Sequence, residues 1–228
     1  MSKLKSSLLA LVQNKWFCLF WLVFGFLYFT IYGMLYVEDL YTEGLRSVNV
    51  FGFLLEPTMT ATASIIGKTY FWGFKGWGLF QAIAISLNVL YAYRKYGYAT
   101  KFAKAGKILL IAGAVCIAMC VMIRSTEEPG LQRFGHWAGA LLFAFFDAVA
   151  LGFVIAHLAK KEGIAAKGTL AFFIAMLALM LGLLIFVGKS GAIETIPMWG
   201  AFIILYLLNF TNLYKKYLPA VAETGEPA

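Results

Sequence analysis

The sequence predicts an all-α, polytopic membrane protein: a bundle of six transmembrane helices with both termini in the cytoplasm. Three observations predict this fold class. First, the 228 residues are 62% hydrophobic and 13% charged, whereas a soluble domain is about half apolar and about a quarter charged. Second, the apolar residues fall into six blocks of roughly the ~20 residues that a helix needs to cross a bilayer. Third, Lys and Arg gather in every second connection, as they do in cytoplasmic loops.

Each predicted span is an apolar segment between charged or polar connections. We expect a single domain over residues 16–217, with spans at about 16–36, 70–92, 108–123, 135–157, 169–188 and 198–214. Residues 1–15 carry three lysines between leucines, which predicts a basic amphipathic lead-in on the membrane surface. The first span is too long for a typical signal-peptide core, so we interpret it as a retained anchor. Residues 218–228 are expected to form a polar tail.

The longest connection covers residues 37–69. Its segment 48–67 is too apolar for a fully solvated loop. We expect it to lie on the membrane or to fold back over the mouth of the bundle. Pro57 would break or begin any helix there.

The basic residues predict the orientation. Most of the 19 Lys and Arg residues lie in the N-terminal segment, in residues 93–107, in residues 158–168 and in the C-terminal segment. Because cytoplasmic loops carry an excess of Lys and Arg, these four segments are predicted to be cytoplasmic. The same placement explains the net charge of +8, so we expect no nucleic-acid partner.

Asp147 lies in the middle of the fourth predicted span, close to the bilayer midplane. Ionisable residues inside a membrane are costly, so each one is a functional hypothesis. A carboxylate there must meet a partner, reach water or take up a proton. Gln81, at similar depth in the second span, is the expected partner. A structural hydrogen bond between helices, a proton relay and a substrate contact are all open for Asp147.

His136 is expected where the outer connections converge. Arg124, Arg133, Glu56 and Glu194 are predicted at the same level. A His beside a carboxylate can act as an acid–base pair, and arginines can hold a lipid phosphate. A solvated rim of ion pairs explains the same residues equally well.

The His and Cys pattern argues against a haem or metal centre. His136 and His157 are 21 residues apart on one helix, which is roughly 31 Å by helical rise, so they cannot bind one iron. A zinc site needs several clustered ligands. Cys18, Cys116 and Cys120 lie inside apolar spans and are expected to be small packing residues. We therefore expect no cofactor and no metal.

Four patches along residues 80–217 resemble a known family. They comprise Phe80, Asn88 and Arg94 in the second span, Lys104 and Gly106 at the start of the third, His136, Gly139 and Ala140 in the fourth, and Ala192, Ile193 and Glu194 before the last. In these patches the chain is similar to the six-helix DRAM-like membrane proteins, which include autophagy modulators, a GPI-anchor lipid-remodelling protein and bacterial relatives. The resemblance implies six spans and a link to membrane lipids.

Three functions are open. The first is a non-enzymatic membrane protein that binds lipids or partner proteins at an outer rim of His136, Glu194 and Arg133, because no phosphate loop or nucleophile elbow is present. The second is a lipid-modifying enzyme with His136 and Glu194 as acid–base residues. The third is a small transporter or proton-coupled carrier that uses Asp147 and Gln81.

Membrane lipids are the expected partners in each case, and protein partners or a homo-oligomer are open. Asn88 joins Gln81 as a polar candidate binding residue of the second span. A bacterial inner membrane and a eukaryotic cell membrane or endomembrane both fit the sequence.

Overall fold

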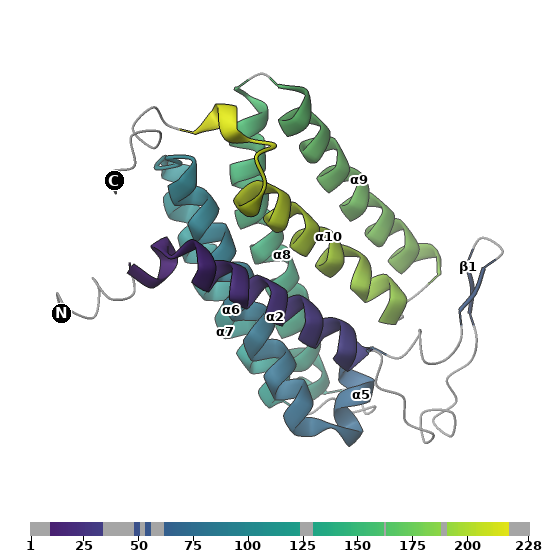
Figure 1. Ribbon diagram of the computed structural model, residues 1–228. Helices are drawn as coiled ribbons and strands as arrows, with labels where there is room; N and C mark the ends of the chain where they lie inside the picture. Colours follow the sequence, from purple (N-terminus) through teal and green to yellow (C-terminus); the bar gives the residue numbers. More distant parts are fainter. Residues whose placement is uncertain are drawn as a thin grey trace.

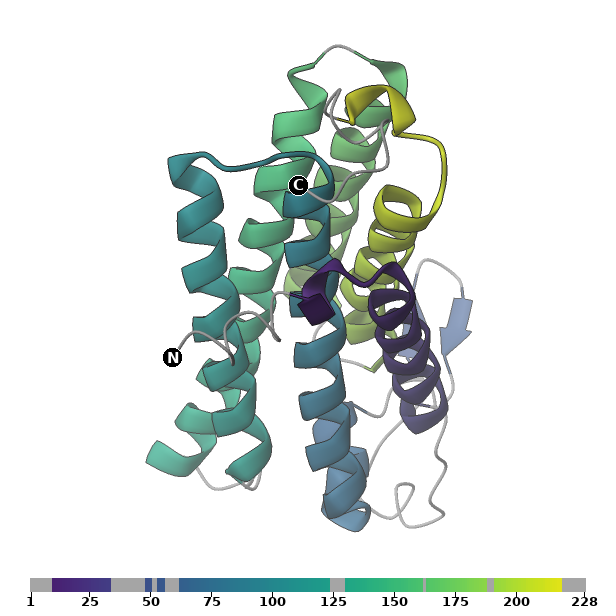
Figure 2. The same cartoon turned by 60° about the vertical axis from the view of Figure 1, so that its left-hand side comes forward.

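The computed structural model describes residues 10–33, 48–50, 53–55, 62–123, 130–161, 163–187 and 191–218. Long helices run side by side in a bundle (Figures 1 and 2). The helices are α2 (Lys15–Gly33), α5 (Ala63–Thr69), α6 (Phe71–Lys95), α7 (Lys101–Met122), α8 (Leu131–Ala159), α9 (Ile164–Phe186), α10 (Gly191–Phe210) and the 3-10 turn η1 (Lys215–Tyr217). Most of the predicted lead-in 1–15 and of the tail 218–228 lies outside the described residues.

Among the described residues, five helical segments are long and apolar enough to cross a membrane: α2, α7, α8, α9 and, within α10, Ile193–Phe210. The prediction of a helical, multi-pass membrane protein is confirmed at that level. Helix α6 has 25 residues, which is long enough for a crossing, but it is less apolar than the other five. A crossing by α6, and with it the count of six spans, stays a prediction.

Protein surrounds α6 on several sides, which explains its polar composition. The helix contacts α2, α5, α7, α8 and α10, and its polar side chains Gln81 and Asn88 are fully buried. A helix that faces other helices can carry hydrogen-bonding side chains that a lipid-facing helix cannot. Helix α9 shows the converse, because it lies at the edge of the bundle and exposes apolar side chains such as Ile174, Leu181 and Ile185.

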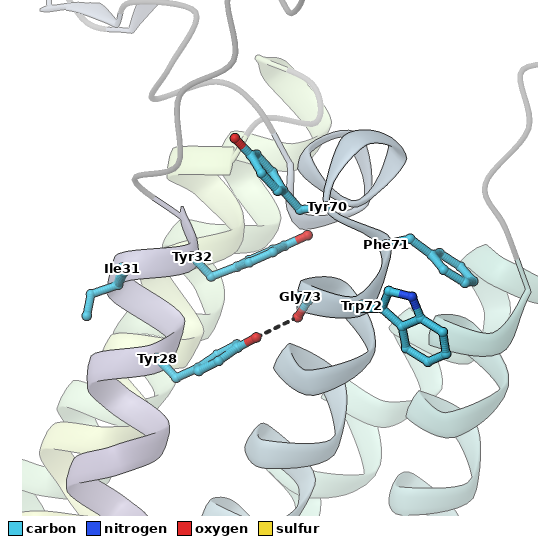
Figure 3. Close-up of a pocket in the computed structure, with 7 residues that line it drawn as sticks. All are labelled: Tyr28, Ile31, Tyr32, Tyr70, Phe71, Trp72 and Gly73. Atoms are coloured by element: carbon cyan, nitrogen blue, oxygen red, sulfur yellow. Dashed lines mark hydrogen bonds between the residues drawn. The ribbon is translucent and has the colours of Figure 1, made fainter.

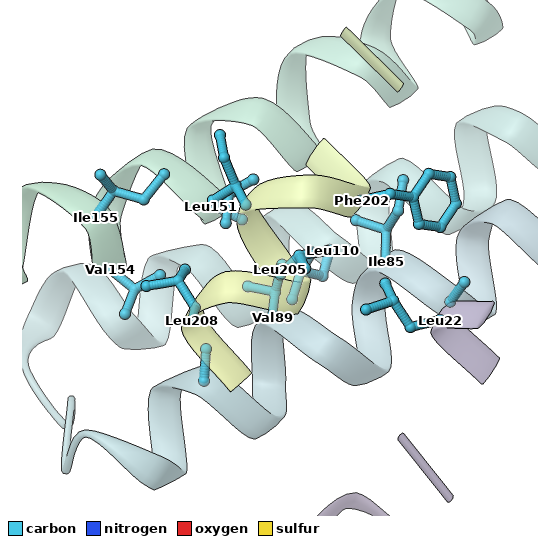
Figure 4. Close-up of a cluster of buried hydrophobic side chains, with 14 of the residues drawn as sticks. Leu22, Ile85, Val89, Leu110, Leu151, Val154, Ile155, Phe202, Leu205 and Leu208 are labelled. Atoms are coloured by element: carbon cyan, nitrogen blue, oxygen red, sulfur yellow. The ribbon is translucent and has the colours of Figure 1, made fainter. Parts of the chain in front are cut away.

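The centre of the apolar core lies between α2, α6, α7, α8 and α10 (Figure 4). Its central side chains are Leu22 of α2, Ile85 and Val89 of α6, Leu110 of α7, Leu151, Val154 and Ile155 of α8, and Phe202, Leu205 and Leu208 of α10. Close packing of such side chains, rather than exclusion of water, holds helices together in a bilayer.

Helices α7 and α8 pack along a seam of small residues. The buried positions of α7 recur at intervals of three and four: Ala103, Gly106, Leu110, Gly113, Ile117 and Cys120. Those of α8 recur in the same way: His136, Gly139, Phe143, Asp147, Ala150 and Val154. Such spacing places each set on one helix face. A Cβ atom on Gly139 would lie 2.6 Å from the Cys116 carbonyl oxygen, so only glycine lets the backbones approach this closely.

The starts of α7 and α10 differ most from the predicted boundaries. Helix α7 begins at Lys101 rather than near 108, because the Thr100 hydroxyl accepts a hydrogen bond from the Ala103 amide and caps the helix. Its first lysines are exposed and fall outside the apolar segment on which the prediction rested. Helix α10 begins at Gly191 rather than near 198 and contains Pro197. Proline removes one backbone hydrogen bond from a helix, yet this helix continues through it.

A short hairpin departs from the all-α expectation. Strands β1 (Val48–Val50) and β2 (Phe53–Leu55) pair antiparallel, with Val48 opposite Leu55 and Val50 opposite Phe53. Val and Phe favour strands, which explains why this apolar segment is extended rather than helical. Glu56 and Pro57 lie outside the described residues, whereas α5, at the end of the connection, packs on α6 and α2.

The bundle has two chemically different ends. At one end the α6–α7 turn, the α8–α9 turn and η1 come together: Lys95 Nζ donates to the Leu208 and Asn209 carbonyls at 2.8 Å each, and the rings of Tyr98 and His157 lie 4.6 Å apart. We call this the Lys-rich end, because it carries Lys15, Arg94, Lys95, Lys101, Lys104, Lys107, Lys160, Lys161, Lys167, Lys215 and Lys216. The described basic residues toward the opposite end are Lys68, Lys75 and Arg133.

Candidate functional site

An open pocket lies between α2 and the start of α6, at the end opposite the lysines (Figure 3). Its volume is about 390 Å³, and it is lined by Tyr28, Ile31, Tyr32, Tyr70, Phe71, Trp72 and Gly73. This volume falls in the ~300–1,000 Å³ range of small-molecule sites. The lining is aromatic and aliphatic, so the pocket suits an apolar ligand or the apolar part of an amphiphile.

Two tyrosines of α2 form one wall of this pocket. The rings of Tyr28 and Tyr32 are stacked, with centroids 6.3 Å apart and an interplanar angle of 9°. The Tyr28 hydroxyl donates to the Gly73 carbonyl at 2.9 Å (Figure 3). The Tyr32 hydroxyl donates to the Ala63 carbonyl at 3.0 Å. Because both hydroxyls are bound to backbone, the wall is fixed in place and offers mainly ring surface.

Glycines of α6 make room for this wall. A Cβ atom on Gly73 would lie 3.2 Å from the Tyr32 ring, and one on Gly76 would lie 2.8 Å from the Tyr28 hydroxyl oxygen. Any larger side chain at position 73 would therefore enter the pocket or displace its wall.

A cation lies beside the pocket. The Lys75 ammonium lies 4.3 Å from the ring centroid of Phe71 and 4.4 Å from that of Trp72, and both rings belong to lining residues. Cation–π contacts of this kind hold a lysine near aromatic side chains while its stem covers apolar surface. The site thus combines an apolar pocket with one positive charge.

Glu194 binds the start of α5. The Ala63 amide donates to Glu194 Oε2 at 3.4 Å, next to the Thr62 hydroxyl that caps α5. Glu194 also lies in the first turn of α10, where a negative charge is favourable against the helix dipole. These contacts connect α10 to α5 and, through Ala63, to Tyr32 of the pocket wall.

His136 caps the end of α7. Its side chain is 2% exposed, and Nδ1 lies 2.9 Å from the Cys120 carbonyl oxygen and 3.0 Å from that of Ile123. Carbonyl oxygens only accept hydrogen bonds, so Nδ1 carries the proton and donates to both. His136 is therefore a buried residue of the α7–α8 seam and not part of a solvated rim.

The two other predicted rim residues that the structure describes, Arg133 and Glu194, have contacts of their own. Arg133 lies over the Trp137 ring at 6.0 Å from its centroid, and Glu194 binds Ala63. Arg124 and Glu56 lie outside the described residues. In the described part of the chain, no three His, Cys, Asp or Glu side chains form a group that could hold a metal ion.

The predicted pairing of Asp147 with Gln81 is wrong. Gln81 Nε2 donates to the Gly25 carbonyl of α2 at 3.2 Å. Both carboxyl oxygens of Asp147 are buried and have no hydrogen-bond partner among the described residues. The sequence pattern predicts a similar depth in the bilayer for the two side chains. In the structure, however, Gln81 is turned toward α2, and Asp147 lies in the α7–α8 seam against Gly113.

Asn88 has a structural role in the packing of three helices. Its Nδ2 donates to the Cys18 carbonyl of α2 at 3.0 Å and to the Ala84 carbonyl of its own helix at 2.8 Å. Asn209 Nδ2 of α10 donates in turn to the Asn88 carbonyl at 2.9 Å and to Asn88 Oδ1 at 3.3 Å. Hydrogen bonds of this kind, donated by a side-chain amide of one helix to a neighbouring helix, fix helices against each other in a membrane.

Comparison with protein-family models, curated proteins and solved structures finds no match for this chain. The similarity to DRAM-like proteins therefore stays a prediction from the four sequence patches.

Sequence reasoning missed the aromatic pocket. Tyr32 and Trp72 lie near the ends of the first two predicted spans, where such residues most often belong to interfacial aromatic belts. The available signal was the spacing of Tyr28 and Tyr32, four residues apart on one helix face. Nothing in the sequence placed that face against residues 70–73.

Proposed function

We propose that this chain is an integral membrane protein that crosses the bilayer six times, has both termini in the cytoplasm, and binds a membrane lipid in the aromatic pocket between α2 and α6. The pocket is the observation that carries the binding proposal.

The outward-facing surface of the helices supports the membrane part of the proposal. Large apolar side chains are exposed along the lengths of α2, α7, α8, α9 and α10; on α7 and α9 they include Ile108, Ile111, Val115, Phe172 and Leu179. A soluble monomer rarely exposes a continuous apolar surface of this extent. In a bilayer, the acyl chains of lipids cover it.

The two ends of the bundle support the orientation. Cytoplasmic segments near spans are enriched in Lys and Arg, so the Lys-rich end is proposed to face the cytoplasm. A sixth crossing by α6 is required for this arrangement, because only then do the α6–α7 turn and the start of α2 lie on the same side. The aromatic pocket then faces the outer leaflet.

The chemistry of the pocket favours a lipid over a polar solute. The hydroxyls of Tyr28 and Tyr32 are already bound to backbone, so the wall that these two residues form has few polar groups left to recognise a polar ligand. Lys75, beside the pocket, has a charge that suits the phosphate of a phospholipid headgroup. An acyl chain in the pocket and a phosphate near Lys75 would use both features.

Filling the pocket tests the proposal. We expect Gly73→Leu to lose most of the lipid that the wild-type protein retains, at least fivefold by native mass spectrometry of protein extracted with its own membrane lipids. Gly182→Leu on α9 is the matched control, because a Cβ atom there meets nothing within 4 Å. Equal lipid retention by the Gly73 variant, the control and the wild type would refute binding in this pocket.

The lipid-modifying alternative receives less support from the geometry. His136 uses Nδ1 to cap α7, and its side chain is shielded from solvent. The proton-coupled carrier alternative keeps one supporting observation, the unpartnered buried carboxyl group of Asp147.

A further inference from the structure

Asp147 is enclosed in the α7–α8 seam. Its side chain is 5% exposed, and neither oxygen meets a hydrogen-bond donor among the described residues. A Cβ atom built on Gly113 would lie 2.7 Å from Oδ1 and 3.7 Å from the Phe143 ring. The carboxyl group therefore occupies the space that a side chain at position 113 would fill.

The groups around this carboxyl are apolar. Above and below Gly113 on the same face, α7 presents Leu110 and Ile117, and α8 presents Phe143 and Ala150. The nearest lysine along α7, Lys107, is six residues from Gly113, roughly 9 Å by helical rise.

The other described titratable and charged groups of helices α6 to α10 form no hydrogen bond with the Asp147 carboxyl group. On α6, the Tyr93 hydroxyl donates to the Ala150 carbonyl at 2.6 Å, and Tyr91, Lys75, Arg94 and Lys95 lie toward the helix ends. The described remainder comprises Cys116, Cys120, Lys101 and Lys104 on α7, Lys167 on α9, Glu194 and Tyr206 on α10, and Arg133, His136 and His157 on α8 itself.

An ionised carboxylate in these surroundings would be buried without a counter-charge or a donor, which is among the most costly arrangements in a protein. Protonation neutralises the carboxylate, so that the apolar seam has to accommodate only one hydroxyl group and no charge. The closed seam is therefore compatible with the acid and not with its anion.

We propose that Asp147 is a proton-binding site: the carboxyl group carries a proton while α7 and α8 are packed together, and it releases the proton only when the seam opens. The ligand is the proton, and the packing of α7 on α8 is coupled to its binding. This proposal is independent of lipid binding at the aromatic pocket, which lies between other helices.

Labelling with the hydrophobic reagent dicyclohexylcarbodiimide tests the site in the intact protein. A carboxylic acid adds across one C=N bond of the reagent and gives its proton to nitrogen; the acyl group then moves from oxygen to nitrogen, so that nothing leaves. Only the protonated acid starts this addition, so we expect a labelled Asp147 peptide by mass spectrometry at about pH 7, where an ordinary exposed carboxyl group is ionised and does not react.

Two variants serve as controls for the labelling. Asp147→Asn should abolish the labelled peptide, whereas Glu194→Gln, which removes a half-buried carboxyl at the end of the bundle, should leave it unchanged. No labelling of Asp147 in the folded protein at about pH 7 would overturn the proposal.

The pH dependence of stability gives a second, independent measurement. If the folded state holds a proton that the unfolded state releases, the ratio of folded to unfolded protein falls as pH rises, by up to about tenfold per pH unit above the carboxyl's ordinary titration range. Asp147→Asn keeps the shape and the two histidines but removes this titration, so we expect a flatter profile. Parallel profiles for wild type and Asp147→Asn would contradict proton binding at Asp147.

Discussion

At the scale of single residues, His136 shows that a candidate catalytic side chain can instead be engaged in hydrogen bonds that stabilise the fold. Helix ends leave carbonyl groups without intrahelical partners, and the imidazole Nδ1 satisfies those of Cys120 and Ile123 at the end of α7. The Phe74 ring, with its centroid 5.9 Å from the imidazole centroid, covers the same side chain. The residue was predicted from its place near the outer connections, but its function in the fold is capping.

This role predicts that an amide can replace the imidazole. His136→Asn can keep a donor close to the Nδ1 position, so we expect stability near wild type. His136→Ala leaves buried carbonyl groups unpaired and should cost about 1–3 kcal/mol. Thermal unfolding in detergent measures both variants. A loss of lipid turnover in a stably folded His136→Asn variant would instead support the enzyme alternative.

At the scale of elements, the α7–α8 seam depends on glycine. The spacing of small residues along both helices brings the backbones together, and Gly139 meets backbone atoms of Cys116 and Cys120 rather than flexible side chains. Backbone atoms cannot turn aside, so an added methyl group must separate the helices.

We therefore expect Gly139→Ala to destabilise the protein by about 1–3 kcal/mol through overpacking. Gly182→Ala on α9 is the comparison, since it adds a methyl group in open space and replaces a poor helix former. That change should be neutral or stabilising by up to about 1 kcal/mol. The midpoint of thermal unfolding in one detergent compares the two. Equal midpoints would show that the close approach at Gly139 does not limit stability.

At the scale of the whole molecule, polarity is distributed by position in the bundle. Helix α6 contacts most of the other helices and carries buried amides, whereas α9 lies at the edge and is almost wholly apolar. In a bilayer the lipid-facing helix must be the more apolar one, because lipid offers no hydrogen bonds. A crossing by α6 is consistent with this rule although its composition alone does not show it.

Labelling of one introduced cysteine at a time tests whether α6 crosses the membrane. With six spans, Leu131→Cys should react with a membrane-impermeant maleimide on intact cells, and Ala99→Cys only after permeabilisation. Both positions are exposed. If α6 did not cross, the two results would be exchanged, because α7 would then run in the opposite direction. The wild-type protein, with Cys18 and Cys120 buried and Cys116 half-buried, provides the background.

Blocks of apolar residues between charged connections were enough to predict the helical class and the approximate positions of the long helices, because such blocks are a local property of the chain. The start of α7 was missed because its cap, Thr100, precedes an amphipathic turn rather than an apolar one. The hairpin was missed because six residues of extended chain give little pattern.

The tertiary structure alone decided which side chains meet. The sequence predicts a similar depth in the bilayer for Gln81 and Asp147. The orientation of each helix about its own axis nevertheless directs Gln81 toward α2 and Asp147 into the seam at Gly113. The aromatic pocket depends in the same way on Tyr28 and Tyr32 lying against Gly73. Sequence spacing determines which residues share a helix face; the packing of helices determines what that face touches, because it depends on side chains far apart in the chain.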